Sequence, residues 1–172
     1  MQRPEPGEYK HYFDRYISRV DEDDVLGLLE RQIAEIRALL GALSAEQSRY
    51  RYAEAKWSVR GVVDHLIDAE RIFGYRALCI SRGETHELPS FDENEYAAAS
   101  DADRCDLGSL LDELEVARRS NLAMMRRFDD GAWSRIGTAS SGPISPRALA
   151  FIIAGHQRHH VRILEERYGL GR

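Results

Sequence analysis

Residues 145–169 read SPRALAFIIAGHQRHHVRILEERYG, and this stretch decides the fold. Ser145 followed by Pro146 is typical of a helix start, with serine as the N-cap and proline at the first helical position. Apolar residues then recur every three or four positions as far as Tyr168, and Gly169 is a typical helix stop. The stretch therefore predicts a helix of roughly twenty residues with one face turned towards a core.

Three earlier segments show the same spacing of apolar side chains. They cover residues 25–43, with Asp24 as a plausible N-cap, residues 58–82, with Ser58 as the N-cap, and residues 110–128. Four helices of similar length predict an all-α protein, and in particular a four-helix bundle.

The remaining segments are expected to be less regular. Residues 84–104 contain Pro, Ser, Asp and Asn without a sustained period, so we expect a long connection with at most one helical turn. Residues 129–145 are rich in glycine and serine and are predicted to form a loop. Residues 1–20 mix aromatic side chains with charges, which is typical of an amphipathic arm that packs on the bundle or on a neighbouring subunit. The predicted organisation is an arm over residues 1–20 and one bundle domain over residues 21–172.

Length, charge and cysteine content exclude several classes of protein. A chain of 172 residues can bury one core without a disulfide or metal staple, and its apolar stretches, such as residues 148–154, are far shorter than a membrane span. The net charge of −5 argues against a nucleic-acid partner. Cys79 and Cys105 are too few for a disulfide framework, and residues 1–10 contain no apolar signal core, so a cytoplasmic location is expected.

Three histidines cluster in the quoted stretch, at His156, His159 and His160. At about 100° per residue the apolar side chains of this helix average about 20° from His156, which places His160 at about 40° and His159 at about −60°. His156 and His160 therefore point towards the core, whereas His159 lies at its edge. Because burying two unpartnered imidazoles is costly and imidazoles at i and i+4 can bind one divalent ion, this pair predicts a metal site.

His65 is the other histidine on a core-facing helix, within the apolar stripe of residues 58–82. Alone it would more commonly be a hydrogen-bonded core histidine, but together with His156 and His160 it predicts a three-histidine site between facing helices. Three protein ligands leave a fourth position for water or substrate, as in catalytic sites. His11 and His86 lie in segments outside the core and are not expected to be ligands.

The charged residues near His65 have alternative roles. Asp68 lies one turn further along and could accept the second ring N–H of His65, but its helical angle favours a surface ion pair, for which Arg71 is the nearest partner. Asp64 and Glu70 lie off the inner stripe and are expected to be solvated.

Five short segments follow one another in a specific order: KWS at 56–58, HLIDAER at 65–71, YRAL at 75–78, LPSFDENEY at 88–96 and GHQRHH at 155–160. Together they resemble the DinB-like (YfiT-like) superfamily, and the resemblance extends over nearly the whole chain. It implies a four-helix bundle of up-down-down-up layout, commonly a homodimer. It also implies a divalent metal held by His65, His156 and His160, with His159 matching a family histidine that is not usually a ligand.

The resemblance also implies a function. Families with this fold include transferases and isomerases that use low-molecular-weight thiols such as bacillithiol or mycothiol, and proteins described as metal-dependent hydrolases. A metal with an open position can activate a thiol or water at neutral pH. We therefore expect a thiol-dependent S-transferase or a hydrolase that acts on a small-molecule substrate.

Several details of that function are expectations of their own. Zinc or nickel is the expected metal, although imidazole ligands also suit copper and iron. Arg71, Tyr75 and Arg76 are candidate substrate or cofactor contacts, although for each arginine the sequence favours a helix-surface ion pair. The alternative function is a non-catalytic metal-binding module for stress response or interaction.

Overall fold

Four long helices form the fold, and each begins directly after a residue that caps it. They are α2 (Val25–Leu40), α4 (Val59–Ser81), α6 (Leu107–Met125) and α8 (Pro146–Tyr168). In this computed structural model, which describes residues 2–171, the side chains of Asp24, Ser58, Asp106 and Ser145 each accept a backbone N–H of the following helix. Gly169 ends α8 in the left-handed conformation, with φ +72°. The predicted all-α four-helix bundle is confirmed.

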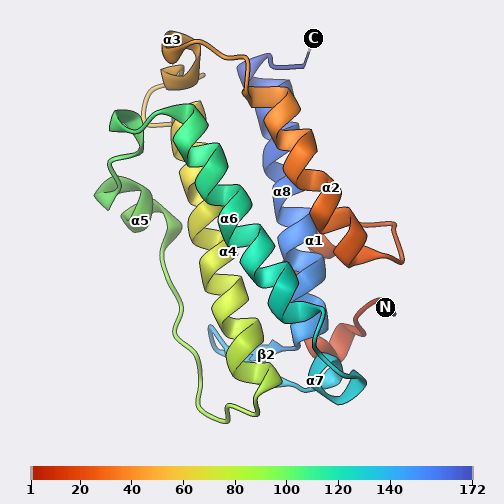
Figure 1. The fold of residues 1–172 in the computed structure, drawn as a ribbon. Helices are drawn as coiled ribbons and strands as arrows, with labels where there is room; N and C mark the ends of the chain where they lie inside the picture. Colours follow the sequence, from red (N-terminus) through yellow and green to blue (C-terminus); the bar gives the residue numbers. More distant parts are fainter. Residues whose placement is uncertain (1, 172) are drawn as a thin grey trace.

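The helices have an up-down-down-up arrangement. α2 and α8 run in one direction and α4 and α6 in the other (Figure 1). α2 and α4 each contact both α6 and α8. Because α4 and α6 contact each other and run in the same direction, they are parallel neighbours. Consecutive parallel helices need a connection that returns along the bundle, and Figure 1 shows the segment after α4 doing so. This topology is the reason for the long connection between α4 and α6.

That connection is more ordered than the sequence predicted. It contains α5 (Glu93–Ala99) and a 3-10 turn at Ala102–Arg104, so the expectation of at most one helical turn is wrong. The side chain of Asp92 accepts the backbone N–H groups of Asn94 and Glu95, and this cap starts α5 without an apolar period. The shorter connection between α2 and α4 contains α3 (Ala45–Arg49).

Regular structure also replaces the loop predicted over residues 129–145. The segment forms α7 (Asp130–Ser134) and a hairpin of β1 (Gly137–Ala139) and β2 (Gly142–Ile144). Ser140 and Ser141 at the hairpin tip have φ values of +52° and +60°. Positive φ at both central residues is the geometry of a type I′ turn, which usually carries Asn or Gly, so the sequence lacked the common hairpin signal.

The N-terminal arm packs on α8 of its own chain, which is one of its two predicted positions. Its elements are 3-10 turns at Pro6–Glu8 and His11–Phe13 and the short helix α1 (Asp14–Ile17). Tyr16 and Ile17 are buried. The closest approach is at Gly155, where an added Cβ would lie 2.0 Å from the Tyr16 carbonyl oxygen. Glycine at this position therefore lets the arm reach the α8 backbone.

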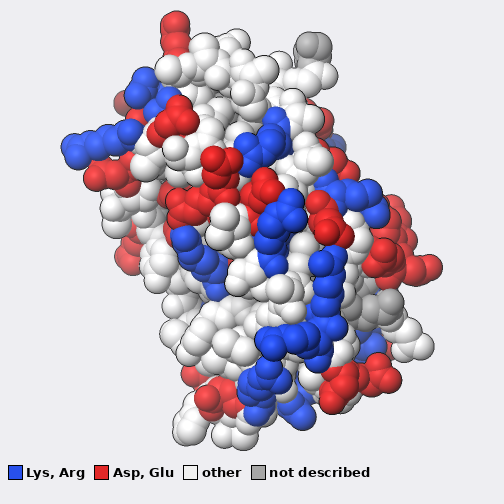
Figure 2. Space-filling model, viewed as in Figure 1, with Lys and Arg blue, Asp and Glu red and all other residues white. Residues whose placement is uncertain are grey.

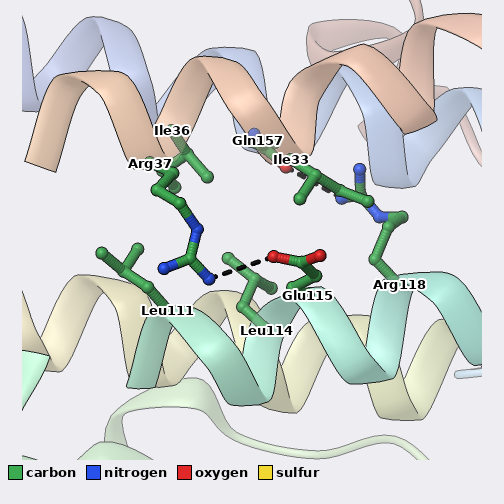
Figure 3. Close-up of a pocket in the computed structure, with 8 residues that line it drawn as sticks. All are labelled: Ile33, Ile36, Arg37, Leu111, Leu114, Glu115, Arg118 and Gln157. Carbon is green, nitrogen blue, oxygen red and sulfur yellow. Dashed lines mark hydrogen bonds and ion pairs between the residues drawn. The ribbon is translucent and has the colours of Figure 1, made fainter. Parts of the chain in front are cut away.

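A buried ion pair connects all four long helices. Arg118 of α6 donates from Nε to Glu70 of α4 at 2.9 Å, and its remaining nitrogens donate to the Leu29 carbonyl of α2 and to Gln157 of α8, each at 2.9 Å. Figure 3 shows Arg118 and Gln157 beside a cavity of only about 10 Å³, too small for a ligand. The expectation that Glu70 is solvated is wrong, because a cation from another helix gives its carboxylate a partner inside the core.

The surface carries both signs of charge. Acidic and basic side chains alternate over the upper part of the face in Figure 2, and basic ones gather towards its lower end, where α6 ends. Arg126 and Arg127 follow the last residue of α6, where positive charge complements the helix dipole. Within residues 2–171, no helix combines the length and apolarity needed to cross a membrane.

Candidate metal centre

Three imidazoles meet in the core of the bundle, one from α4 and two from consecutive turns of α8. The Nε2 atom of His156 lies 3.0 Å from Nε2 of His65 and 3.2 Å from Nε2 of His160. All three residues are buried, with exposed fractions of 8%, 5% and 8% for His65, His156 and His160. These are the three residues that the sequence predicted to lie together, and the structure brings them together.

The donor set fits a divalent ion better than it fits a hydrogen-bonded cluster. Nitrogens about 2.0–2.1 Å from a tetrahedral ion lie roughly 3.3 Å from one another, close to the observed separations. A ring nitrogen carries either one hydrogen or one lone pair, so Nε2 of His156 cannot form two good hydrogen bonds at once. Among the described residues the three rings have no other hydrogen-bond partner. A cation approached by all three lone pairs removes this conflict.

Burial keeps the three imidazoles neutral. It lowers the pKa of His65 to about 4. Burial, reinforced by the neighbouring histidines, holds the pKa values of His156 and His160 well below 6.5. A metal binds the neutral imidazole, so all three rings are in the ligand form at neutral pH.

Aromatic side chains hold the rings in place. Tyr16 and Phe73 contact His156 edge-on, with ring centroids 5.1 and 6.1 Å away, and Trp57 lies 4.7 Å from the His65 ring. The sequence analysis assigned no site role to these three residues. Trp57 lies in the KWS segment, one of the segments that carry the family resemblance, and this membership could have indicated that Trp57 belongs to the site.

Asp68 and Arg71 do not form the ion pair that the sequence favoured. Arg71 pairs instead with Glu113 of α6 at 2.6 Å. Asp68 makes no hydrogen bond to His65 within residues 2–171, and burial together with nearby Asp64 raises the pKa of its carboxyl. Asp64 is half-buried and accepts a hydrogen bond from Ser100 at 2.6 Å.

The other histidines do not join the three converging nitrogens, although the His159 ring centroid lies 5.1 Å from that of His160. His159 is half-buried beside Tyr16, at a ring-centroid distance of 5.6 Å. His11 and His86 are exposed beside Asp14 and Glu84, respectively.

The three histidines line one wall of a cavity of about 510 Å³. This volume is in the usual range for small-molecule sites. The arm, the residues just before α4, α4 itself, the α4–α6 connection and the β-hairpin supply the other walls, and six of the side chains there are aromatic: Tyr12, Phe13, Tyr16, Trp57, Phe73 and Phe91. The cavity therefore offers an apolar space next to the histidines.

Arg76 is a buried cation on the wall of this cavity. Only 4% of it is exposed, and its Nη2 donates to the Pro89 carbonyl at 2.7 Å and to Ser140 Oγ at 2.9 Å. No carboxylate of residues 2–171 lies within ion-pair distance, and burial lowers its pKa. The surface ion pair that the sequence favoured for Arg76 is wrong, because the α4–α6 connection and the hairpin cover this side chain. Tyr75 is 57% exposed and lines an adjoining cavity of about 300 Å³ together with Arg71 and Arg76.

Comparison with known proteins places these features in context. A family model described as the DinB superfamily matches residues 28–164. The structure is similar to YfiT from Bacillus subtilis, described as "a probable metal-dependent hydrolase with an unusual four-helix bundle topology", with a TM-score of 0.72 and 22% identity over 98% of this chain and 94% of that one.

A second similar structure is the mycothiol-dependent maleylpyruvate isomerase. Its TM-score is 0.65 at 14% identity, and the match covers 84% of this chain but only 61% of the isomerase. No curated protein matches the sequence. At these identities both structural likenesses concern the fold.

Proposed function

The chain belongs to the DinB superfamily, and from this premise we propose that it is a metal-dependent enzyme whose ion is held by His65, His156 and His160. Its reaction is a thiol-dependent S-transfer or a hydrolysis, with zinc or nickel as the metal. The observation that carries the proposal is the convergence of three buried, neutral imidazoles at one edge of a cavity large enough for a substrate.

The side chains around the three converging imidazoles would have different roles. A divalent ion bound there would act as a Lewis acid and lower the pKa of a thiol or water molecule that reaches it. The histidines would hold the ion from one side, and Tyr16, Trp57 and Phe73 contact the rings and line the cavity beside them. Because the histidines also line the cavity, a molecule in the cavity can approach the same point.

The neighbours support the two reaction classes without choosing between them. One similar structure is described as "a probable metal-dependent hydrolase", and the other, a mycothiol-dependent isomerase, supports the use of a thiol. The cysteines of this chain do not line the cavity, so a thiol in the reaction would be a small molecule from solution.

Metal analysis of protein purified without an affinity tag tests the metal site. We expect one divalent ion per chain in the wild-type protein and its loss in His156→Ala. The matched control is His86→Ala, which removes an exposed histidine outside the cavity and should retain the ion. Sub-stoichiometric metal that does not change with His156→Ala would disprove the proposal.

Two turnover assays on metal-loaded protein then separate the reaction classes. Conjugation of mycothiol or bacillithiol to monochlorobimane reports S-transfer, and release of p-nitrophenol from an ester without added thiol reports hydrolysis. We expect one of the two activities, and its loss in His65→Ala. If the ion raises the melting temperature but neither reaction proceeds, the non-catalytic metal-binding module becomes the better description.

The expected homodimer and cytoplasmic location stay predictions. Sedimentation equilibrium of the purified chain tests the first of these directly.

A further inference from the structure

Arg76 forms a second recognition point in the histidine cavity. We propose that its guanidinium binds the carboxylate of the substrate, so that the protein acts on small organic acids with an apolar body. The reaction of such an acid rests on the proposed metal-dependent function, whereas its binding depends on Arg76 and the cavity alone.

Some hydrogen-bond donors of the Arg76 guanidinium have no partner among the described residues. Both hydrogens of Nη2 are used, on the Pro89 carbonyl and on Ser140 Oγ. Neither Nε nor Nη1 has a partner among the described residues, yet no side-chain nitrogen or oxygen there is both sealed from solvent and unpaired. The free N–H groups therefore face accessible space, and the two cavities that Arg76 lines provide it. A buried cation without a counter-ion is costly, and a bound carboxylate would supply the missing charge.

Arg76 is also held rigidly by segments distant in the sequence. Leu88 donates its backbone N–H to Thr138 at 2.8 Å and accepts that of Ser140 at 3.1 Å, so the α4–α6 connection lies along the hairpin. These bonds align the Pro89 carbonyl and Ser140 Oγ on one guanidinium nitrogen. Ser140 keeps a left-handed backbone conformation that non-glycine residues rarely adopt, a form of strain that clusters at ligand sites. A cation positioned in this way binds an anion with little loss of side-chain entropy.

The charged side chains around the cavity favour an anion. Lys10, Arg15 and Arg76 line it, against the single carboxylate of Glu93, and the histidines at its edge are neutral. The Lys10 ammonium donates to the Ser140 carbonyl at 2.5 Å, so a second cation lies beside the residue that holds Arg76. Excess positive charge in a cleft raises the local concentration of anionic ligands.

The space between Arg76 and the histidines selects an apolar body. The Phe73 ring centroid lies 5.8 Å from the guanidinium carbon and 6.1 Å from the His156 ring centroid, and Phe91 lies 6.0 Å from the same guanidinium. One aromatic ring thus spans the distance between the cation and the metal centre. A small acid with its carboxylate on Arg76 would place its hydrocarbon part on Phe73 and its far end towards the histidines.

Binding of cinnamate and of its neutral amide, cinnamamide, to metal-free protein tests the proposal by calorimetry. The two probes have nearly the same size and apolar body, but cinnamamide lacks the negative charge and has an NH2 donor in place of one acceptor oxygen. Chelation removes the metal as a competing carboxylate site. We expect cinnamate to bind wild-type protein at least about tenfold more tightly than cinnamamide, as a charge-assisted hydrogen bond implies. Arg76→Gln should abolish that preference. Arg119→Gln, which removes an exposed arginine of α6 that lines neither cavity, should retain it.

A measurement on the unaltered chain covers the case in which Arg76→Gln fails to fold. Cinnamate should shift the Nε–Hε resonance of Arg76 in a ¹H–¹⁵N spectrum of wild-type protein, and cinnamamide should not. Equal affinity for the two probes, or an unshifted Arg76 resonance, would overturn the proposal. Displacement of cinnamate by inorganic phosphate at lower concentration than by acetate would overturn it in favour of a phosphate site.

The test of the Arg76 acid site and the test of the metal centre can fail independently of each other. If the acid site is wrong, wild-type protein still binds one ion per chain. If the metal centre is wrong, metal-free His156→Ala still prefers cinnamate to cinnamamide.

Discussion

Glu70→Gln should be among the most destabilising single changes in this protein. The substitution removes the charge that partners Arg118, where the two side chains are only 2% and 3% exposed. Removing one member of a fully buried pair costs about 3–5 kcal/mol, because the remaining charge loses its counter-ion in the core. Glutamine can still accept one hydrogen bond through its amide oxygen. The expected loss therefore lies near about 3 kcal/mol, a large part of the ~5–15 kcal/mol that stabilises a typical domain.

Urea unfolding of metal-free protein at pH 7, followed by circular dichroism, measures this loss. Glu113→Gln is the matched control, since it removes a carboxylate from the exposed pair with Arg71 between the same two helices, and it should cost less than about 1 kcal/mol. A double variant, Glu70→Gln with Arg118→Met, should be more stable than the sum of the two single losses predicts. A loss below about 1 kcal/mol for Glu70→Gln, or simple additivity, would refute the reasoning.

Three further outcomes are expected. Gly155→Ala should lower the free energy of unfolding by about 1–3 kcal/mol in urea and move Tyr16 off the His156 ring. The reason is that the added Cβ would lie 2.0 Å from the backbone oxygen of Tyr16. A loss below about 0.5 kcal/mol would contradict this contact. Burial raises the pKa of the Glu8 carboxyl, but hydrogen bonds from Arg147 and Ser145 outweigh this effect and hold it below 4.5. Glu8→Gln should therefore destabilise by about 1.5–3 kcal/mol at pH 7, and unfolding at a series of pH values should show the difference from wild type vanish as the pH falls below 4.5 through the folded-state pKa. A divalent ion at one hundred times its Kd should stabilise the metal-free protein by about 2.7 kcal/mol, and unchanged thermal unfolding would count against a native-state site.

The parts of the fold that sequence predicted well depend on neighbouring residues. The caps at Asp24, Ser58 and Ser145 act on backbone groups three positions away, and the apolar period reports one helix face. The inward orientation of His156 and His160 could be predicted in the same way, since the two residues are separated by one turn of a single helix. His65 could be added because it lies in the apolar stripe of another long helix.

The parts that sequence misjudged depend on distant partners. Glu70 lies off the apolar stripe, and only its encounter with Arg118 makes burial favourable. Arg76 looked like a surface residue because the residues that cover it, Pro89 and Ser140, come from two other segments. The hairpin around Ser140 was missed for the same reason, since its strained turn is supported by bonds to Leu88.

The sequence by itself thus determined a bundle of four capped helices and which histidines face its core, because period and capping are properties of local chain geometry. Only the tertiary structure decided that the Nε2 atoms of His65 and His160 lie 3.0 and 3.2 Å from that of His156, the spacing of ligands around one ion. It also decided that a buried guanidinium, with no carboxylate in reach among residues 2–171, faces the same cavity, and that Glu70 joins the helices rather than meeting water. Those outcomes depend on distances and charges between segments that only folding brings together.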